Sequence, residues 1–194
     1  MFWDWWQNLF TDTPAYAFFN FKFLPKYGYA VIQGVEYTLI LSVVSVLLAV
    51  LPALLLATMR LSKNTPIRWL SGAYIAIFRS TPMLVQLMII YLGVFFYIPV
   101  PKFMIFGFID STRFIPGITA LALNSSAYVA EIFRAGILAV DSGQMEAARS
   151  LGLSQSQSMR LVILPQAVKN VLPALANEFI TLLKELHLYD ARHG

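Results

Sequence analysis

The sequence predicts an all-α integral membrane protein, a polytopic helical bundle in which four membrane spans are visible. Two observations lead to this fold class. Of the 194 residues, 58% are hydrophobic and only 12% are charged, and this composition suits a bilayer rather than water. The apolar residues also gather into stretches long enough to cross a hydrocarbon core of about 30 Å, which takes roughly 20 helical residues. The length fits one domain.

Residues 1–33 are predicted to form an N-terminal interfacial or extracytoplasmic segment. The segment has no basic n-region and no small-residue cleavage site, so it does not resemble a signal peptide. Trp3, Trp5 and Trp6 are residues typical of the headgroup level of a membrane. The net charge of +4 comes from basic residues near the ends of apolar runs, where headgroups account for them, and nucleic-acid binding is not expected.

We place the spans near residues 34–59, 66–98, 114–138 and 164–186, within a transmembrane domain over 34–185. The second stretch is long, and Pro82 breaks its backbone hydrogen bonding. It is therefore a single kinked crossing or two short ones.

The positive charges favour the single crossing, although Lys22 and Lys26 before the first span count the other way. Arg60, Lys63 and Arg68 lie in the first loop, and Arg149 and Arg160 lie in the third. A single kinked crossing puts both loops on the same side, as the excess of basic residues in cytoplasmic loops favours. We therefore expect loops 60–66 and 139–163 in the cytoplasm, with the N-terminus and residues 99–113 outside.

Residues 139–163 form a polar loop between two apolar stretches, with signals for a helix, a bend and a second helix. Asp141 and Ser142 are N-cap types for a helix over 143–151, and Gly152 supplies its C-terminal stop. The Ser154-x-x-Gln157 spacing is that of a capping box, which would begin the second short helix.

The same loop contains a spaced motif: Glu146-Ala147-Ala148, three residues, Gly152, nine residues, then Val162-x-Leu164-Pro165. It resembles the EAA loop of ABC-importer membrane subunits, with Val162 where that family has isoleucine. Residues 78–87, 126–136 and 164–179 resemble the polar-amino-acid branch of these permeases, the histidine, glutamine, arginine and glutamate type. The resemblance covers residues 28–185.

The resemblance implies a MetI-like core of five spans in a bacterial inner membrane. It implies a second permease subunit, identical or related, two ABC ATP-binding subunits, an extracytoplasmic solute-binding protein and an amino-acid substrate. By position, the residues that dock on the ATPase are Glu146, Ala147, Ala148, Gly152, Leu164 and Pro165. The chain has no phosphate-binding loop, so ATP is expected on the partner, and we expect no catalytic residue, metal or cofactor in this chain.

Polar residues inside the spans are the candidates for a substrate path, because ionisable groups are costly in a membrane. They are Arg79, Thr81, Pro82, Asn124, Ser126, Glu131, Asn177 and Glu178. Each has a structural alternative: Arg79 satisfies the carbonyls freed by Pro82 or meets a substrate carboxylate, and Asn124 and Ser126 hold helices together or line a cavity.

Two further groups of polar residues also have both a structural interpretation and a substrate-path interpretation. Glu131 and Arg134 lie three residues apart and can pair along one helical face, either as a structural pair or in the path. Asn177, Glu178 and Thr181 form a stripe that is predicted to face the bundle, with or without a substrate contact.

Residues 186–194 are predicted to be a tail outside the family pattern, where the family has a fifth span. Truncation is therefore expected, and the alternative function is a truncated, non-transporting fragment or scaffold that still docks the ATPase. An intramembrane enzyme is not expected, because no Ser/His or paired-Asp arrangement lies in the spans, and His187 and His193 lie in the tail.

Overall fold

The computed structural model describes residues 24–190, except 106 and 108. The interfacial tryptophans Trp3, Trp5 and Trp6, and His193, lie outside the described residues. The chain divides into two compact units, residues 1–38 and 39–194, and the arrangement described below is that of the second unit.

The helix α2 (Leu24–Arg60) contains the first predicted span and begins ten residues before it. Within the second unit its buried face consists of Leu41 and of the small residues Ser42, Ser45, Ala49, Ala53 and Ala57. Large aliphatic side chains such as Leu47, Leu51 and Leu55 are exposed on the other side. Small residues inside and large apolar residues outside are typical of a helix that packs against protein on one face and lipid on the other.

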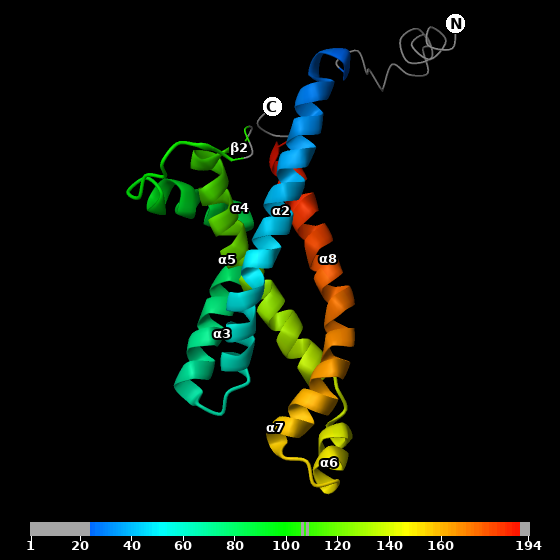
Figure 1. The fold of residues 1–194 in the computed structure, drawn as a ribbon. Coiled ribbons are helices and arrows are strands. Elements are labelled where there is room, and N and C mark those ends of the chain that lie inside the picture. The colour runs from blue at the N-terminus through cyan, green and yellow to red at the C-terminus, as the bar shows by residue number, and fades with distance from the viewer. Residues whose placement is uncertain (1–23, 106, 108, 191–194) are drawn as a thin grey trace, which may run out of the picture. The chain divides into compact units, whose positions relative to one another are not determined.

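The second predicted span is broken, as Pro82 predicted. The helix α3 (Thr65–Ser80) ends before Pro82, and α4 (Met83–Met88) and the π-helical turn η3 (Ile89–Val94) follow it at an angle of 105°. In Figure 1 the turn between α2 and α3 lies at the same end as the 139–163 loop, and the hairpin that contains β2 lies at the other end. This is the arrangement that a single kinked crossing predicts.

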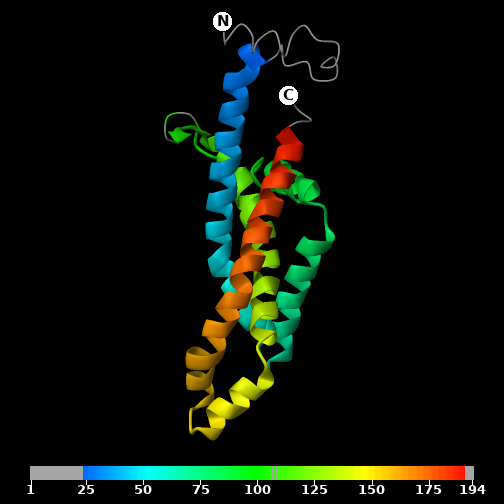
Figure 2. The same cartoon turned by 90° about the vertical axis from the view of Figure 1, so that its right-hand side faces the viewer.

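The helix α5 (Ser111–Leu138) follows a short antiparallel hairpin of β1 (Met104–Ile105) and β2 (Ile109–Asp110). It packs against α3, α4, η3 and α8 (Leu164–Asp190), and Figure 2 shows it behind α8 with α3 beside it. The core joins Ala127, Val129 and Ala130 of α5 to Ile75 of α3 and to Ala53 and Ala57 of α2. The third predicted span is therefore the central helix of the described unit.

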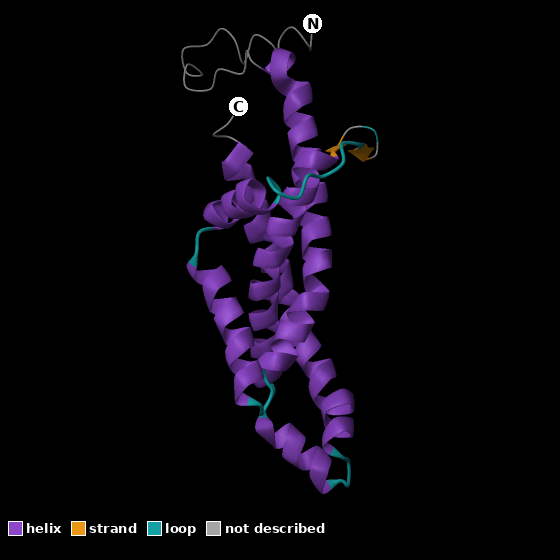
Figure 3. Ribbon diagram, turned by 90° about the vertical axis from the view of Figure 1, so that its left-hand side faces the viewer, coloured by secondary structure: helices purple, strands orange, loops and turns teal. Residues whose placement is uncertain are grey.

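The 139–163 loop is helical along most of its length. It contains α6 (Ser142–Ser150), α7 (Gln155–Ser158) and the π-helical turn η4 (Met159–Ile163), which leads directly into α8. Figure 3 shows these elements beyond the ends of the long helices, joined by short loops. The helix α8 continues past the predicted domain boundary at residue 185.

All four predicted spans are helical, but they differ in apolar character. Within the described residues, Ile32–Arg60 alone is a helix long and apolar enough to cross a membrane, and the bent pair Thr65–Ser80 with Met83–Val94 qualifies when counted as one span. The helix α5 has buried polar residues at its centre, Asn124, Ser125 and Ser126, which lowers its apolar character. Crossing by α5 and α8 therefore remains a prediction.

Candidate functional sites: the 139–163 segment and the break between α3 and α4

The helix α6 begins and ends as its sequence predicts. Oδ1 of Asp141 accepts a hydrogen bond from the amide of Gly143 at 2.7 Å, which satisfies one of the free donors of the first turn. At the other end Gly152 has φ +86°, a left-handed conformation that L side chains adopt at a cost. The predicted cap and the predicted glycine stop are both confirmed.

The second short helix is also confirmed. The Ser154 hydroxyl accepts from the amide of Gln157 at 3.3 Å, and Oε1 of Gln157 accepts from the amide of Ser154 at 2.9 Å. These are the two reciprocal bonds of a capping box. The segment is therefore helix, bend, helix.

The motif residues of the 139–163 segment differ in exposure. Glu146, Ala147 and Gly152 are exposed, and so are Leu164 and Pro165 at the start of α8. Ala148 is only 4% exposed, because α6 packs its face against η4. Ala148 therefore lies inside the segment, where a partner cannot contact its side chain without rearrangement.

An exposed leucine accompanies the motif. Leu151 is 84% exposed, although it is apolar and lies in a polar loop. Leu151 is not one of the motif residues, and its signal in the sequence is an apolar residue next to the glycine of a predicted bend. Isolated surface leucines are common, but this one adjoins Gly152 at the tip of the segment.

Side-chain bonds hold the 139–163 segment to the start of α8. Nε2 of Gln166 donates to Oε1 of Gln144 at 3.2 Å, and Nη1 of Arg149 donates to Oε1 of Gln155 at 2.9 Å. The first bond joins α6 to α8, and the second joins α6 to α7. A force on α6 would therefore reach α8 directly.

The break between α3 and α4 is held by Gln86, a residue that the sequence analysis did not select. Its Nε2 donates to the carbonyl oxygen of Phe78 at 2.7 Å and to the hydroxyl oxygen of Thr81 at 2.7 Å. In the part of the chain that the structure describes, Arg79 makes no hydrogen bond to a freed carbonyl. The structural alternative for Arg79 is therefore wrong, because a buried neutral amide reaches these carbonyls from within the bundle, while Arg79 is exposed.

Arg79 lies instead against α5, with its guanidinium carbon 5.2 Å from the centroid of the Tyr128 ring. This is a cation–π distance. Among the described residues Arg79 forms no ion pair, so its charge is available to an anionic group.

Glu131 and Arg134 form the predicted pair on α5. Nε of Arg134 donates to both carboxylate oxygens, at 2.9 and 3.0 Å, and Nη2 also donates to Oε1. The charges of Arg79 and Arg60 act on the same carboxylate from neighbouring helices. Around Glu131 the positive charges of α2, α3 and α5 therefore outnumber its single negative charge.

The small polar residues of α5 join helices in this conformation. Nδ2 of Asn124 donates to Oε1 of Gln86 at 2.8 Å, and the Ser126 hydroxyl bonds to the hydroxyl of Tyr74 at 2.9 Å. Both α5 residues are buried. The structure thus shows their helix-joining role, and a contact with substrate remains a prediction.

The polar stripe on α8 does not face the bundle throughout. Asn177 and Thr181 are exposed in the described chain, whereas Glu178 is half-buried. The prediction that the whole stripe faces the bundle is therefore wrong for Asn177 and Thr181. The cause is that the bundle covers α8 on the side of residues such as Val171 and Leu182, which are buried.

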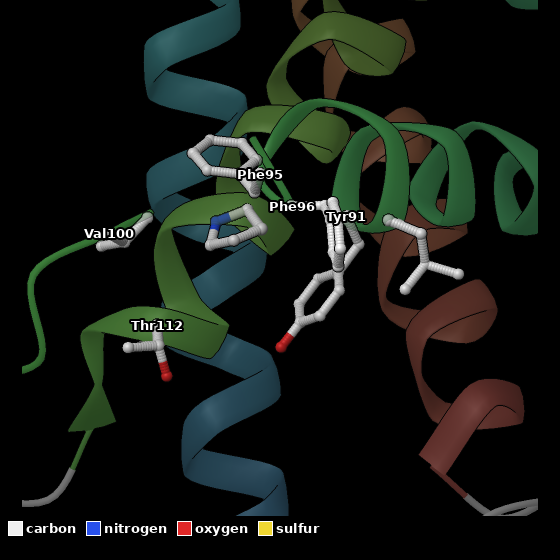
Figure 4. A pocket seen from close by; sticks show the side chains of 7 residues that line it. Tyr91, Phe95, Phe96, Val100 and Thr112 are labelled. Atoms are coloured by element: carbon white, nitrogen blue, oxygen red, sulfur yellow. The ribbon is translucent and has the colours of Figure 1, made fainter. Parts of the chain in front are cut away.

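A separate apolar pocket of about 240 Å³ lies at the start of α5 (Figure 4). Its walls include the aromatic side chains of Tyr91, Phe95 and Phe96, and they are completed by Leu92, Val100, Thr112 and Pro116. No candidate path residue lines it, so this pocket is distinct from the predicted path.

Comparison with known proteins establishes the family. The family of binding-protein-dependent transport system inner membrane components matches residues 45–188. The chain belongs to this family. The resemblance seen in the motifs is thereby confirmed, and the permease fold is that of an inner-membrane transport component.

Relatives of this permease are amino-acid transport proteins. It is 42% identical over 164 residues to the putative glutamine transport system permease protein GlnP of Rickettsia typhi, covering 84% of this chain and 71% of that one. It is 42% identical over 155 residues to the arginine transport system permease protein ArtQ of Bacillus subtilis, covering 80% and 67%.

A solved structure agrees in fold. The crystal structure of an amino acid ABC transporter with histidines is 46% identical to this permease, with a TM-score of 0.75, and the match covers 88% of this chain and 75% of that chain. The match supports a permease subunit of an amino-acid ABC transporter over the non-transporting scaffold.

Proposed function

We propose that this permease moves a polar amino acid across a bacterial inner membrane by alternating access, driven by ATP that a separate subunit hydrolyses. The observation that carries the proposal is the exposed surface of the 139–163 segment, where Glu146, Ala147 and Leu151 face outward on a base bonded to α8. Such a segment can transmit a partner's movement to α8 as a rigid body.

The family and the exposed surfaces of this permease support three kinds of partner. An ABC ATP-binding subunit docks on the 139–163 segment, a second permease subunit packs against this one, and an extracytoplasmic solute-binding protein delivers the amino acid. The exposed Asn177 and Thr181 suit contact with a second subunit, because uncovered polar groups on a membrane helix are costly. In this arrangement α5 and α8 cross the membrane although they are less apolar than α2.

The substrate class rests on the charged groups beside the break. Arg79 has no carboxylate partner among the described residues, so it can pair with the α-carboxylate of an amino acid. Glu131, which Arg134 already binds and on which the charge of Arg79 acts, is the carboxylate that we assign to the amino group. The glutamine and arginine relatives favour a polar side chain on the substrate.

Accessibility labelling tests the docking. The chain has no cysteine, so Ala147→Cys and Lys102→Cys each provide a single thiol. The first lies in the 139–163 segment, and the second lies just before the β1–β2 hairpin, which Figure 1 shows at the opposite end. A maleimide should label both in the isolated permease, and the ATP-binding subunit should protect Ala147→Cys alone. Equal labelling of Ala147→Cys with and without the bound subunit would contradict the docking proposal.

A further inference from the structure

A continuous series of hydrogen bonds crosses the break between α3 and α4. Asn124 of α5 donates to Oε1 of Gln86, Nε2 of Gln86 donates to the hydroxyl oxygen of Thr81, and that hydroxyl donates to the carbonyl oxygen of Ile77 at 2.9 Å. Gln86 and Asn124 are 6% and 3% exposed. Three helical elements are thus joined through one buried amide.

Both ends of the Gln86 side-chain amide are hydrogen-bonded. Its two N–H groups face three acceptors: the hydroxyl oxygen of Thr81 and the carbonyl oxygen of Phe78, both at 2.7 Å, and the carbonyl oxygen of Thr81 at 3.0 Å. Its oxygen accepts from Asn124, so the amide orientation is fixed by both sides. A flipped amide would place the Gln86 nitrogen against the Asn124 nitrogen.

We propose that Gln86 is a positioning residue for transport, which sets the angle of the break and makes that angle depend on the position of α5. This inference rests on the proposed function, because Arg79 and Thr81 at the break are candidate path residues. Without Gln86, the Phe78 carbonyl would lose its side-chain donor in a region shielded from water, and the break would adopt another angle.

The variants Gln86→Met and Gln86→Glu separate positioning from simple packing. Methionine keeps the length and fills the space but cannot donate or accept these bonds. A glutamate carboxylate cannot donate, and it would face the carbonyl oxygens of Phe78 and Thr81. Its protonated form can donate one bond and still accept from Asn124.

We expect both Gln86 variants to lose uptake, and we expect low pH to restore it in Gln86→Glu only. In the assembled transporter in proteoliposomes, Gln86→Met should raise the KM for the amino acid about tenfold or more. Gln86→Glu should be similarly impaired near pH 8 and should recover several-fold relative to wild type as the pH is lowered toward about 5. The same Gln86→Glu sample is brought to low pH and then back to high pH, because a loss of uptake caused by misfolding would not reverse.

Uptake by each variant is divided by wild-type uptake at the same pH, which cancels the effect of the other titrating groups. The elements around the break carry several charged or titratable side chains, and none of them hydrogen-bonds to Gln86. They are Arg68, Tyr74, Arg79, Tyr91, Arg113, Tyr128, Glu131 and Arg134. Gln33→Glu makes the same chemical change at an exposed position of α2 and should keep the wild-type profile. Wild-type KM and pH profile in both Gln86 variants would overturn the proposal.

A distance measurement makes the test independent of the transported solute. Spin labels on Leu70→Cys in α3 and Leu92→Cys in η3, both exposed positions in a chain without cysteine, report the angle at the break. In the Gln86→Glu background their distance should change reversibly with pH, and in the wild-type background it should not. If wild type transports no amino acid but the spin-label distance in Gln86→Glu changes with pH, the proposed function is wrong and the positioning role of Gln86 stands. A distance unaffected by both Gln86 variants overturns the positioning role.

Discussion

A β-carbon on Gly136 would lie 2.4 Å from Cγ2 of Val171, so α5 and α8 cross at a point where only glycine fits. The same virtual atom would lie 3.3 Å from the carbonyl oxygen of Ala167. Beside this crossing, Nδ2 of Asn170 approaches the carbonyl oxygen of Gly136 at 3.5 Å. The crossing therefore fixes the two helices that flank the 139–163 segment.

We expect Gly136→Ala to destabilise the permease by about 1–3 kcal/mol, because the added methyl group overpacks this crossing. Val171→Ala in the same chain should restore part of the loss, since it removes the Cγ2 atom that clashes. Thermal unfolding of the purified protein measures both variants. A Gly136→Ala protein as stable as wild type would mean that the helices are not held this closely.

Gly152→Val should separate ATP hydrolysis from uptake. The positive φ of Gly152 costs an L residue roughly 1–2 kcal/mol, and a β-branched residue adopts it least readily, so the bend should change its angle. No atom of residues 24–190, with 106 and 108 left aside, lies within 4 Å of a β-carbon there, so backbone conformation rather than crowding is the cause. Gly152→Asn is the matched control, because asparagine tolerates this conformation. Normal coupled uptake by a correctly inserted Gly152→Val protein would refute this role.

Arg79→Gln should raise the KM for the amino acid about tenfold, because a charged hydrogen bond to the substrate carboxylate is lost. The discriminating measurement is competition by the amide derivative of the same amino acid, which has no carboxylate. Wild type should prefer the free acid, and Arg79→Gln should lose that preference. A variant that retained it would place the carboxylate elsewhere.

Stability should fall in acid partly through Asp110 at the start of α5. The hydroxyl of Thr112 and then its amide donate to Oδ1 of Asp110, at 2.7 and 2.9 Å, and these bonds hold the pKa of this carboxyl below its usual value. Because the folded pKa is the lower one, the contribution is present above the unfolded pKa and is lost as the pH falls through the folded value.

Asp110→Asn keeps a capping side chain that does not titrate in this range. We therefore expect the difference in melting temperature between about pH 7 and pH 3 to be smaller for Asp110→Asn than for wild type. An equal difference in the two proteins would show that the Asp110 cap contributes nothing to acid sensitivity.

Short-range signals were the ones that could be predicted from sequence. The Asp141 cap, the Ser154 capping box, the stop at Gly152 and the break at Pro82 each depend on neighbouring residues, and the structure has all of them. The Glu131–Arg134 pair is also local, since residues three apart share a helical face.

Contacts between distant elements could not be predicted in the same way. Gln86 reaches Asn124 across 38 positions of sequence, and nothing in the local pattern distinguishes Gln86 from a polar residue on an outer face. The burial of Ala148 depends on how α6 lies on η4, and the exposure of Asn177 depends on which side of α8 the bundle covers.

ATP-driven uptake by the reconstituted transporter is the decisive measurement of whether this permease carries polar amino acids. Proteoliposomes that contain this permease, its ATP-binding subunit and its solute-binding protein are given labelled glutamine or arginine, with unlabelled amino acids, a sugar and a metal salt as competitors. We expect uptake that requires ATP. Unlabelled polar amino acids should reduce it by competition, and neither the sugar nor the metal salt should. Uptake of the sugar or the metal ion with no competition from any amino acid would contradict it.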